Sequence, residues 1–396
     1  ADEMTETEDL LENEDDAPII KLINAMLSEA IKEGASDIHI NVGSEVTKIR
    51  FRENGVLSDY AQVNILRGKS YISSTYVACV GTSTSFEPGR PQEGRLSLDQ
   101  NQIPLPDNIL SIRVHTSPLA FGQSKMTLRL LYKTDGRIPT ITELGYSSAH
   151  SDNFNKIKSM PHGLIVISGP TGSGKSTTLA SVCGQILEEG DFTENLITVE
   201  DPPEYTIKGA LQQELGNIPD PEKHKEALLQ LMRSALRSDP DMIMLGEVRD
   251  QRAAHSLIEA ASTGHQAFTS LHTNTAMGIF PRLSEFEISK TVLTDHTMMR
   301  GLIAQRLVPL LCNQCKISLR EGYERNHFRD DQYQRYVKFL NDIGKSDTEL
   351  FVKGPGCDCC RGSGFTGRTV IAEMILPDAS FMEFIRNDQF VDARNY

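Results

Sequence analysis

The sequence predicts an α/β protein with at least two folded domains and a small metal-binding element. Between about residues 161 and 305, apolar strand-like segments alternate with helical ones, which is typical of a parallel sheet with helices on both faces. Upstream, residues 17–132 contain a helical segment and then several strand-like segments, which predicts a separate α+β domain. Downstream, residues 306–376 contain two closely spaced pairs of cysteines.

Composition excludes some classes of function. The chain of 396 residues has a formal net charge of −14, which argues against nucleic acid as a direct partner because Lys and Arg supply most of that affinity. No apolar stretch approaches the roughly 20 residues of a membrane span, and nothing near Ala1 resembles a signal peptide. We therefore expect a cytoplasmic protein.

The first domain follows an acidic lead. Residues 2–16 hold nine acids and no base, so we expect 1–16 to be disordered. Apolar residues recur at helical spacing from Pro18 to Glu33, and Gly34 closes this predicted helix. Period-2 patterns in DIHINV and KIRFRENGVL predict strands with a hairpin turn at Asn54-Gly55, and GRLSL, ILSIRVH and KMTLRLL add three more. Residues 133–160 then form a linker with short helical pieces.

The second domain begins with a phosphate-binding pattern. GPTGSGKS (169–176) follows an apolar strand and precedes a helical segment, which is the context that a P-loop requires. Backbone N–H groups of such a loop converge on phosphates, the lysine reaches the β- and γ-phosphates, and the serine hydroxyl of Ser176 binds Mg²⁺. The predicted nucleotide-binding residues are Gly169, Pro170, Thr171, Gly172, Ser173, Gly174, Lys175, Ser176 and Thr177.

MIMLGE (242–247) ends a later apolar strand without the aspartate that usually helps to hold the magnesium. Gly246 has no ligating group, so the metal must depend on Ser176 and on waters held by another acid. LITVEDPPEY (196–205) supplies Glu200, Asp201 and Glu204 at the end of a strand that we expect to share the same sheet edge. Glu247 is then available to orient the attacking water.

Two histidines flank another predicted strand, in TGHQAFTSLHTN (263–274). His272 follows this strand, so we expect it to lie near the γ-phosphate and to sense it. His265 precedes the strand and is a weaker candidate.

Four motifs thus stand in order: GPTGSGKST, VEDPPEY, RSDPDMIMLGEVRD and TGHQAFTSLHTN. Together they resemble the Walker A, Asp box, atypical Walker B and His box of the secretion-type ATPases. That family comprises RecA-like hexameric motors of type II secretion, type IV pilus assembly and related conjugation or type IV secretion systems. Its own Walker B motif has a glycine before the glutamate, as at Gly246 here.

The resemblance extends upstream. GASDIHI, IRFRENGVL, RPQEGRLSL and SIRVHTSPLAFGQSKMTLRLL are similar to the PAS-like domain that precedes the motor in this family. In those proteins ATP lies between the two domains and two arginines of the first domain reach its phosphates. By position in the motif these arginines would be Arg113 and Arg129, and Arg249 also matches a family position.

The cysteine pairs predict a structural metal. Cys312 and Cys315 form one C-x-x-C pair and Cys357 and Cys360 the other, and four thiolates in this arrangement suit tetrahedral zinc. A group of free core thiols is the simpler alternative. Cys359 is the extra cysteine, and it would point away if both of its neighbours ligate. We expect the loop 316–356 to include a helix packed on the motor.

The branch and the function follow from these motifs together. In the family, the tetracysteine element marks secretion and pilus-assembly ATPases, whereas retraction motors usually lack it. We expect a homo-hexameric ATPase that uses ATP, Mg²⁺ and Zn²⁺ to drive type IV pilus assembly or type II secretion. It would act at the periphery of the inner membrane through a platform protein. The expected domains are an ATPase motor (161–305), a zinc subdomain (306–376) and a helical tail (377–396). A conjugation or type IV secretion DNA-transfer ATPase, a pilus retraction motor and a zinc-ribbon scaffold with a regulatory nucleotide site are the alternatives.

Overall fold

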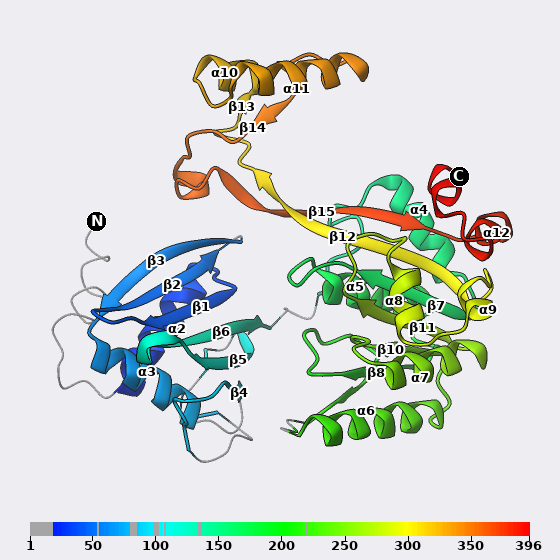
Figure 1. Ribbon diagram of the computed structural model, residues 1–396, viewed down its shortest axis with the longest axis horizontal. Coiled ribbons are helices and arrows are strands. Elements are labelled where there is room, and N and C mark those ends of the chain that lie inside the picture. The colour runs from blue at the N-terminus through cyan, green and yellow to red at the C-terminus, as the bar shows by residue number, and fades with distance from the viewer. Residues whose placement is uncertain are drawn as a thin grey trace. The chain divides into compact units, whose positions relative to one another are not determined.

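The computed structural model describes residues 19–53, 55–79, 85–97, 103, 105–106, 108–133, 137–216, 218 and 220–396. The expected acidic lead, 1–16, lies outside these residues. The chain divides into two compact units, Ala1–Asp135 and Gly136–Tyr396. Figure 1 shows a largely antiparallel sheet in the first and a parallel α/β sheet in the second. In the described part of the chain, no helix combines the length and the apolar character that crossing a membrane requires.

The first unit is a six-stranded antiparallel sheet covered by helices on one face. Its strand order is β3-β2-β1-β6-β5-β4. Its elements are α2 (Ile19–Lys32), β1 (Asp37–Val42), β2 (Thr47–Glu53), β3 (Val56–Val63), α3 (Ile65–Val77), β4 (Gln92–Ser97), β5 (Ile109–Pro118), η1 (Ala120–Gly122) and β6 (Ser124–Tyr132). Alternate strand residues pack against α2 and α3, so the α+β class predicted for this region is confirmed.

Helix α3 is not predicted by the sequence pattern. Its sequence contains Gly68 and several Ser and Thr residues, which have low helix propensity. Two local features still fix the helix. The Asn64 side chain caps it by accepting a hydrogen bond from Arg67 N at 2.8 Å. In addition, a Cβ at Gly68 would lie 2.0 Å from Thr47 Oγ1, so only glycine allows α3 to lie this close to β2.

The second unit is built on a seven-stranded sheet in the order β15-β12-β7-β11-β10-β8-β9. All neighbours are parallel except β15, which is antiparallel to β12. Its elements are α4 (Ser148–Lys158), β7 (Gly163–Ser168), α5 (Lys175–Glu189), β8 (Leu196–Glu200), β9 (Leu211–Glu214), α6 (Pro221–Leu236), β10 (Met242–Leu245), α7 (Gln251–Ser262), β11 (Gln266–Leu271), α8 (Ile279–Glu285), α9 (Lys290–Leu293), β12 (Met299–Leu311), β15 (Phe365–Ile375), α12 (Ala379–Arg386) and α13 (Phe390–Asn395).

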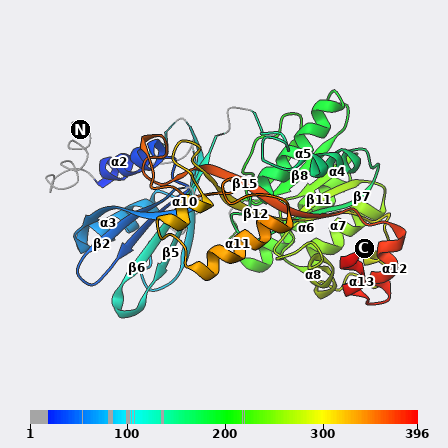
Figure 2. The ribbon, with the colours of Figure 1, turned by 90° about the horizontal axis from the view of Figure 1, so that it is seen from above.

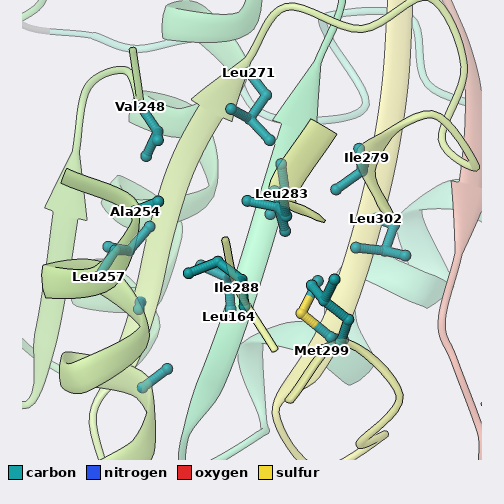
Figure 3. Packing of buried hydrophobic residues seen from close by; sticks show 14 of the residues in the cluster. Leu164, Val248, Ala254, Leu257, Leu271, Ile279, Leu283, Ile288, Met299 and Leu302 are labelled. Atoms are coloured by element: carbon teal, nitrogen blue, oxygen red, sulfur yellow. The ribbon is translucent and has the colours of Figure 1, made fainter. Parts of the chain in front are cut away.

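Helices cover both faces of this sheet, which confirms the predicted α/β architecture. Helices α4 and α5 lie on one side, and α6, α7 and α8 lie on the other (Figure 2). Successive strand residues supply the two cores, since side chains alternate between faces. Figure 3 shows Leu164, Leu271 and Leu302, from three neighbouring strands, gathered beside Leu283 and Ile288.

The β12–β15 pair forms a ribbon that continues into the cysteine-bearing segment. Beyond it lie β13 (Ile317–Ser318), α10 (Leu319–Glu324), α11 (Asp330–Asp342), β14 (Phe351–Val352) and η2 (Asp358–Cys360). The expected helix is α11, but it packs on α10 at the far end of the ribbon (Figure 1) and not on the motor as expected. Tyr333 of α11 stacks on Tyr323 of α10 with ring centres 4.1 Å apart, and Tyr336 of α11 meets Phe328 edge-on.

Candidate nucleotide site and metal centre

The predicted phosphate-binding and acidic residues come together at one edge of the second sheet. The parallel register pairs Ser168 of β7 with Leu271 of β11, and Leu245 of β10 with Val199 of β8. The loops that follow these four strands therefore leave the sheet at the same carboxyl edge, where α/β proteins bind their ligands. This edge carries the phosphate loop, Glu200, Glu247 and His272.

The loop between β7 and α5 has the backbone of a phosphate cradle. Gly172 and Gly174 adopt φ of +76° and +85°, which side chains disfavour, and Gly174 is the N-cap of α5. A Cβ at Gly172 would meet nothing within 4 Å, so the loop faces open space there. Its N–H groups and the helix N-terminus suit an anion. The loop therefore fits the phosphates of a nucleotide.

Lys175 lies on this loop with only 9% of its surface exposed. Its Nζ donates to the carbonyl oxygens of Gly169 (3.0 Å) and Pro170 (3.3 Å). Burial lowers the pKa of the Lys175 ammonium, and the carboxylates of Glu247 and Glu204 act in the opposite direction. The carboxylates of Glu247 and Glu204 therefore interact electrostatically with the Lys175 ammonium.

Glu247 is oriented through both of its carboxylate oxygens. Arg249 Nε donates to Oε2 at 2.9 Å, and His272 Nε2 lies 2.8 Å from Oε1. The Glu247 side chain is 23% exposed. Each carboxylate oxygen can accept a further hydrogen bond, so the group can still bind a water molecule while Arg249 and His272 hold its direction.

Gly246 lies beside Glu200. Its N–H donates to Val199 O at 3.0 Å, and a Cβ at this position would lie 3.6 Å from Glu200 Cγ. The Glu200 carboxylate accepts hydrogen bonds from Gln212 Nε2 (2.9 Å) and Thr198 Oγ1 (2.7 Å). Burial raises the pKa of Glu200, and these hydrogen bonds only partly oppose it. An acid on the neighbouring strand therefore occupies the space next to the missing aspartate.

Asp201 and the segment after it contribute partners that sequence analysis missed. His224 Nε2 lies 3.1 Å from Asp201 Oδ2, and Arg249 Nη1 donates to the same oxygen at 3.4 Å. Arg249 thus links Asp201 to Glu247. Tyr205 OH lies 2.7 Å from Thr177 Oγ1, next to the phosphate loop. Tyr205 is the last residue of the DPPEY segment. No sequence motif contains His224, so its contact with Asp201 could not be predicted.

Three other candidates are not part of this edge of the second sheet. His265 is at the opposite edge of the sheet, where its carbonyl accepts from Gly163 N and its Nδ1 lies 2.9 Å from Ala260 O. Arg113 and Arg129 belong to the first unit, in directly opposed positions of β5 and β6. Arg129 Nε donates to Asp37 Oδ1 at 2.9 Å. The two arginines are therefore neighbours in one sheet row.

The four predicted cysteine ligands converge at the end of the ribbon. The sulfur atoms of Cys312, Cys315, Cys357 and Cys360 lie within 4.8 Å of one another. Three of the separations, between Cys312 and Cys357, Cys315 and Cys360, and Cys357 and Cys360, are each 3.7 Å. Zinc–sulfur bonds of about 2.3 Å in a tetrahedron place the sulfurs about 3.8 Å apart. The group can hold a metal, and its geometry fits zinc.

The backbone around these sulfurs also favours thiolates. The N–H groups of Cys357 and Gly364 each approach Cys360 Sγ at 3.2 Å. Such donors stabilise a negatively charged sulfur. Cys359 is exposed and is not part of the group. Cys79 is buried in the hydrophobic core of the first unit, and Cys183 is buried in a core of the second.

Comparison with known proteins gives consistent results over almost the whole chain. The family model described as "Type II/IV secretion system protein" matches residues 12–395. The type II secretion system ATPase E of Vibrio cholerae is 39% identical over 98% of this chain and 71% of its own length. The type II secretion system protein E of Aeromonas hydrophila is 36% identical over the same shares of the two chains. The structure of the Legionella pneumophila ATPase DotB matches with a TM-score of 0.62 and 20% identity, covering 97% of this chain and 89% of that one, which shows the fold.

Proposed function

Because the chain belongs to the family of type II/IV secretion system proteins, we propose that it hydrolyses ATP to power type II secretion. The observation that carries this proposal is the near full-length similarity to type II secretion ATPases, in a chain that keeps a complete phosphate loop and Glu247 at one sheet edge. The tetracysteine group agrees with the secretion and assembly branch that sequence analysis favoured. Type IV pilus assembly is the closest alternative.

In the proposed mechanism, Glu247 positions the attacking water and accepts its proton. Arg249 and His272 hold the two carboxylate oxygens, so the direction of the acid is set before the water binds. Lys175, on the phosphate loop, neutralises negative charge on the phosphates of the nucleotide. His272 touches Glu247 and lies beyond β11, which suits a group that senses the γ-phosphate. These steps are positioning and electrostatic stabilisation, as phosphoryl transfer requires.

The hydroxyl of Ser176 would bind Mg²⁺ directly, and Glu200 and Glu204 would hold water molecules that bind the metal. Mg²⁺ would neutralise charge on the β- and γ-phosphates and keep several waters of its own. Gly246 leaves room for this arrangement, since Glu200 lies directly beside it. Glu200 is held by two hydrogen bonds and Glu204 is close enough to influence Lys175, so we propose that the two acids are not equivalent.

The remaining parts would serve assembly. Arg113 and Arg129 of the first unit would bind phosphates, and Asp37 already orients the guanidinium of Arg129. Zinc bound by Cys312, Cys315 and their two partners would be structural, because a closed four-thiolate site leaves no open position. We retain the division into 17–132, 133–160, 161–305, 306–376 and 377–396 as a proposal. The motor would act as a hexamer at the inner membrane through a platform protein.

The test is the response of the ATPase activity to partners. We expect turnover by the purified chain to increase when soluble fragments of the inner-membrane secretion platform are added, and not to respond to double-stranded DNA. Lys175→Ala is the matched negative control because it removes the phosphate-binding ammonium. Stimulation by DNA alone would favour a DNA-transfer ATPase and contradict the proposed function.

A further inference from the structure

A buried glutamine lies directly beneath the phosphate loop. Gln305, on β12, is 2% exposed. Its Nε2 donates to the carbonyl oxygen of Ser173 at 2.7 Å. Its Oε1 accepts from Tyr146 OH at 2.6 Å. Both ends of this amide are therefore satisfied inside the protein, as a buried polar side chain requires.

The partners fix which way the amide points. A backbone carbonyl can only accept, so the NH₂ group of Gln305 must face Ser173. Oε1 then faces Tyr146, whose hydroxyl donates to it. The same hydroxyl lies 3.3 Å from Thr178 Oγ1, in the first turns of α5. The chain of hydrogen bonds thus runs from Thr178 through Tyr146 and Gln305 back to the loop at Ser173.

Both ends of the loop are packed against the same residue. A Cβ at Gly169 would lie 2.4 Å from the carbonyl oxygen of Gln305, and a Cβ at Gly174 would lie 3.3 Å from Gln305 Nε2. The first distance is shorter than any non-bonded contact. The glycines at these two positions therefore allow the loop to rest on β12, with the backbone of Gln305 beside Gly169 and its amide beside Gly174.

Peptide geometry converts this contact into an effect on the nucleotide. The carbonyl of Ser173 and the N–H of Gly174 belong to one planar trans peptide unit and point in opposite directions. Gln305 draws the carbonyl toward β12. The Gly174 N–H is then directed away from β12, to the side on which the phosphates bind.

We propose that Gln305 is a positioning residue for the nucleotide. Gln305 fixes the orientation of the Ser173–Gly174 peptide, and Tyr146 orients the side-chain amide of Gln305. The inference rests on the proposed ATPase function of the loop. Gln305 touches neither substrate nor metal in this assignment. It acts through one peptide unit of the cradle, and its loss weakens the binding of every nucleotide that uses that N–H.

The same sheet provides a matched control. Gln266, on β11, is 4% exposed, and its Nε2 donates to the carbonyl oxygens of Ile157 (2.8 Å) and Met160 (3.0 Å). It is a buried glutamine that holds backbone carbonyls, like Gln305, but it lies at the amino-terminal end of β11, away from the phosphate loop. Removing its amide disturbs stability without changing the cradle.

The experiment compares Gln305→Met with Gln266→Met, since methionine keeps the length of the side chain and removes both polar groups. Isothermal calorimetry with ADP and steady-state hydrolysis give Kd, KM and kcat, and thermal melting gives stability. We expect both variants to melt at lower temperature. Only Gln305→Met should raise the Kd for ADP and the KM for ATP by about tenfold, the size of one lost hydrogen bond to a charged group, with a smaller fall in kcat.

Tyr146→Phe keeps the packing and tests the same point if Gln305→Met does not fold. We expect its Kd for ADP to rise about threefold, because the amide keeps Ser173 but loses the group that orients it. A parental Kd in the foldable variants, or an equal rise in Gln266→Met, would overturn the inference. ADP binding does not require hydrolysis. A parental chain that binds ADP but does not hydrolyse ATP would contradict the proposed motor function, and the Kd values of Gln305→Met and Gln266→Met for ADP would still test the role of Gln305.

Discussion

Glu247 and Gly246 show how two adjacent residues divide the chemistry of the site. Glu247 is held at 2.8–2.9 Å by His272 and Arg249, so its carboxylate has a fixed direction. Gly246 has no side chain, and Glu200 from the next strand lies beside it. An aspartate at position 246 would bring a third carboxylate next to Glu200, whose pKa burial already raises. The glycine therefore avoids a repulsion that the site would otherwise contain.

This geometry predicts that Glu247→Gln abolishes turnover without removing binding. The amide keeps the shape and can still accept from Arg249, but it cannot take a proton from water. We expect kcat to fall by roughly a hundredfold or more, while ADP affinity stays within about twofold. Single-turnover hydrolysis and calorimetry measure the two quantities.

Glu188→Gln, on the exposed far end of α5, is the control and should behave like the parent. If Glu247→Gln hydrolyses ATP near the parental rate, then another group activates the water and the assignment of Glu247 is wrong.

The sequence could predict the residues that belong to contiguous motifs. Glu200 ends a strand, and Lys175 and Glu247 come after strands, so the parallel register alone brings them to one edge. Gln305 and Tyr146 could not be predicted this way. Their contact joins positions far apart in the chain, and it depends on which strand lies next to β7. Periodicity does not specify strand order.

At the scale of elements, the β12–β15 ribbon joins the candidate nucleotide site to the group of four cysteines. Gln305 lies on β12, and Cys312 directly follows the same strand. Arg306 also donates to Asn274 at 3.2 Å, and Glu373 on β15 accepts from Ala276 N at 2.7 Å. One ribbon therefore contacts the phosphate loop and the loop after His272.

The sequence did not reveal this continuity. β12 runs from Met299 to Leu311 across the proposed division at 305 and 306, so the motor and the zinc subdomain would share one continuous strand. β15, near the end of the cysteine-bearing region, is an edge strand of the motor sheet. Long-range antiparallel pairing leaves no local pattern, whereas the two C-x-x-C pairs are local and were found.

Zinc content provides a test at this scale. The parental protein should contain one zinc per chain, and Ser at Cys312, Cys315, Cys357 or Cys360 should reduce it to near zero, because a missing thiolate opens the tetrahedral site. Elemental analysis measures the metal. Protease sensitivity of 306–376 should rise in the same variants, since the metal's binding energy also stabilises the local fold.

Cys359→Ser is the matched control within the same turn, and it should keep the metal because Cys359 is exposed and lies outside the sulfur group. Loss of zinc in Cys359→Ser, with retention in Cys357→Ser or Cys360→Ser, would overturn the ligand assignment.

At the scale of the whole molecule, the residues proposed to bind the nucleotide belong to two separate units. Lys175 and Glu247 lie in the second unit, and the neighbouring pair Arg113 and Arg129 lies in the first. In the proposed mechanism, a nucleotide that contacts both sets of residues would couple the two units, and its hydrolysis would release that coupling. In a motor, such a cycle must push on neighbouring subunits. The family resemblance implies that these subunits form a ring of six chains.

We therefore expect nucleotide to promote a hexamer. Light scattering with a non-hydrolysed ATP analogue and Mg²⁺ should give about six times the chain mass of 44.0 kDa, and specific activity should rise with protein concentration because assembly completes the site. Lys175→Ala should stay at the mass seen without nucleotide, since it lacks the ammonium that binds the phosphates. Arg129→Ala should bind ADP but assemble poorly, because the phosphate contact proposed for the first unit is then lost. A parental chain that stays monomeric with saturating analogue, at every concentration at which it hydrolyses ATP, would exclude the ring.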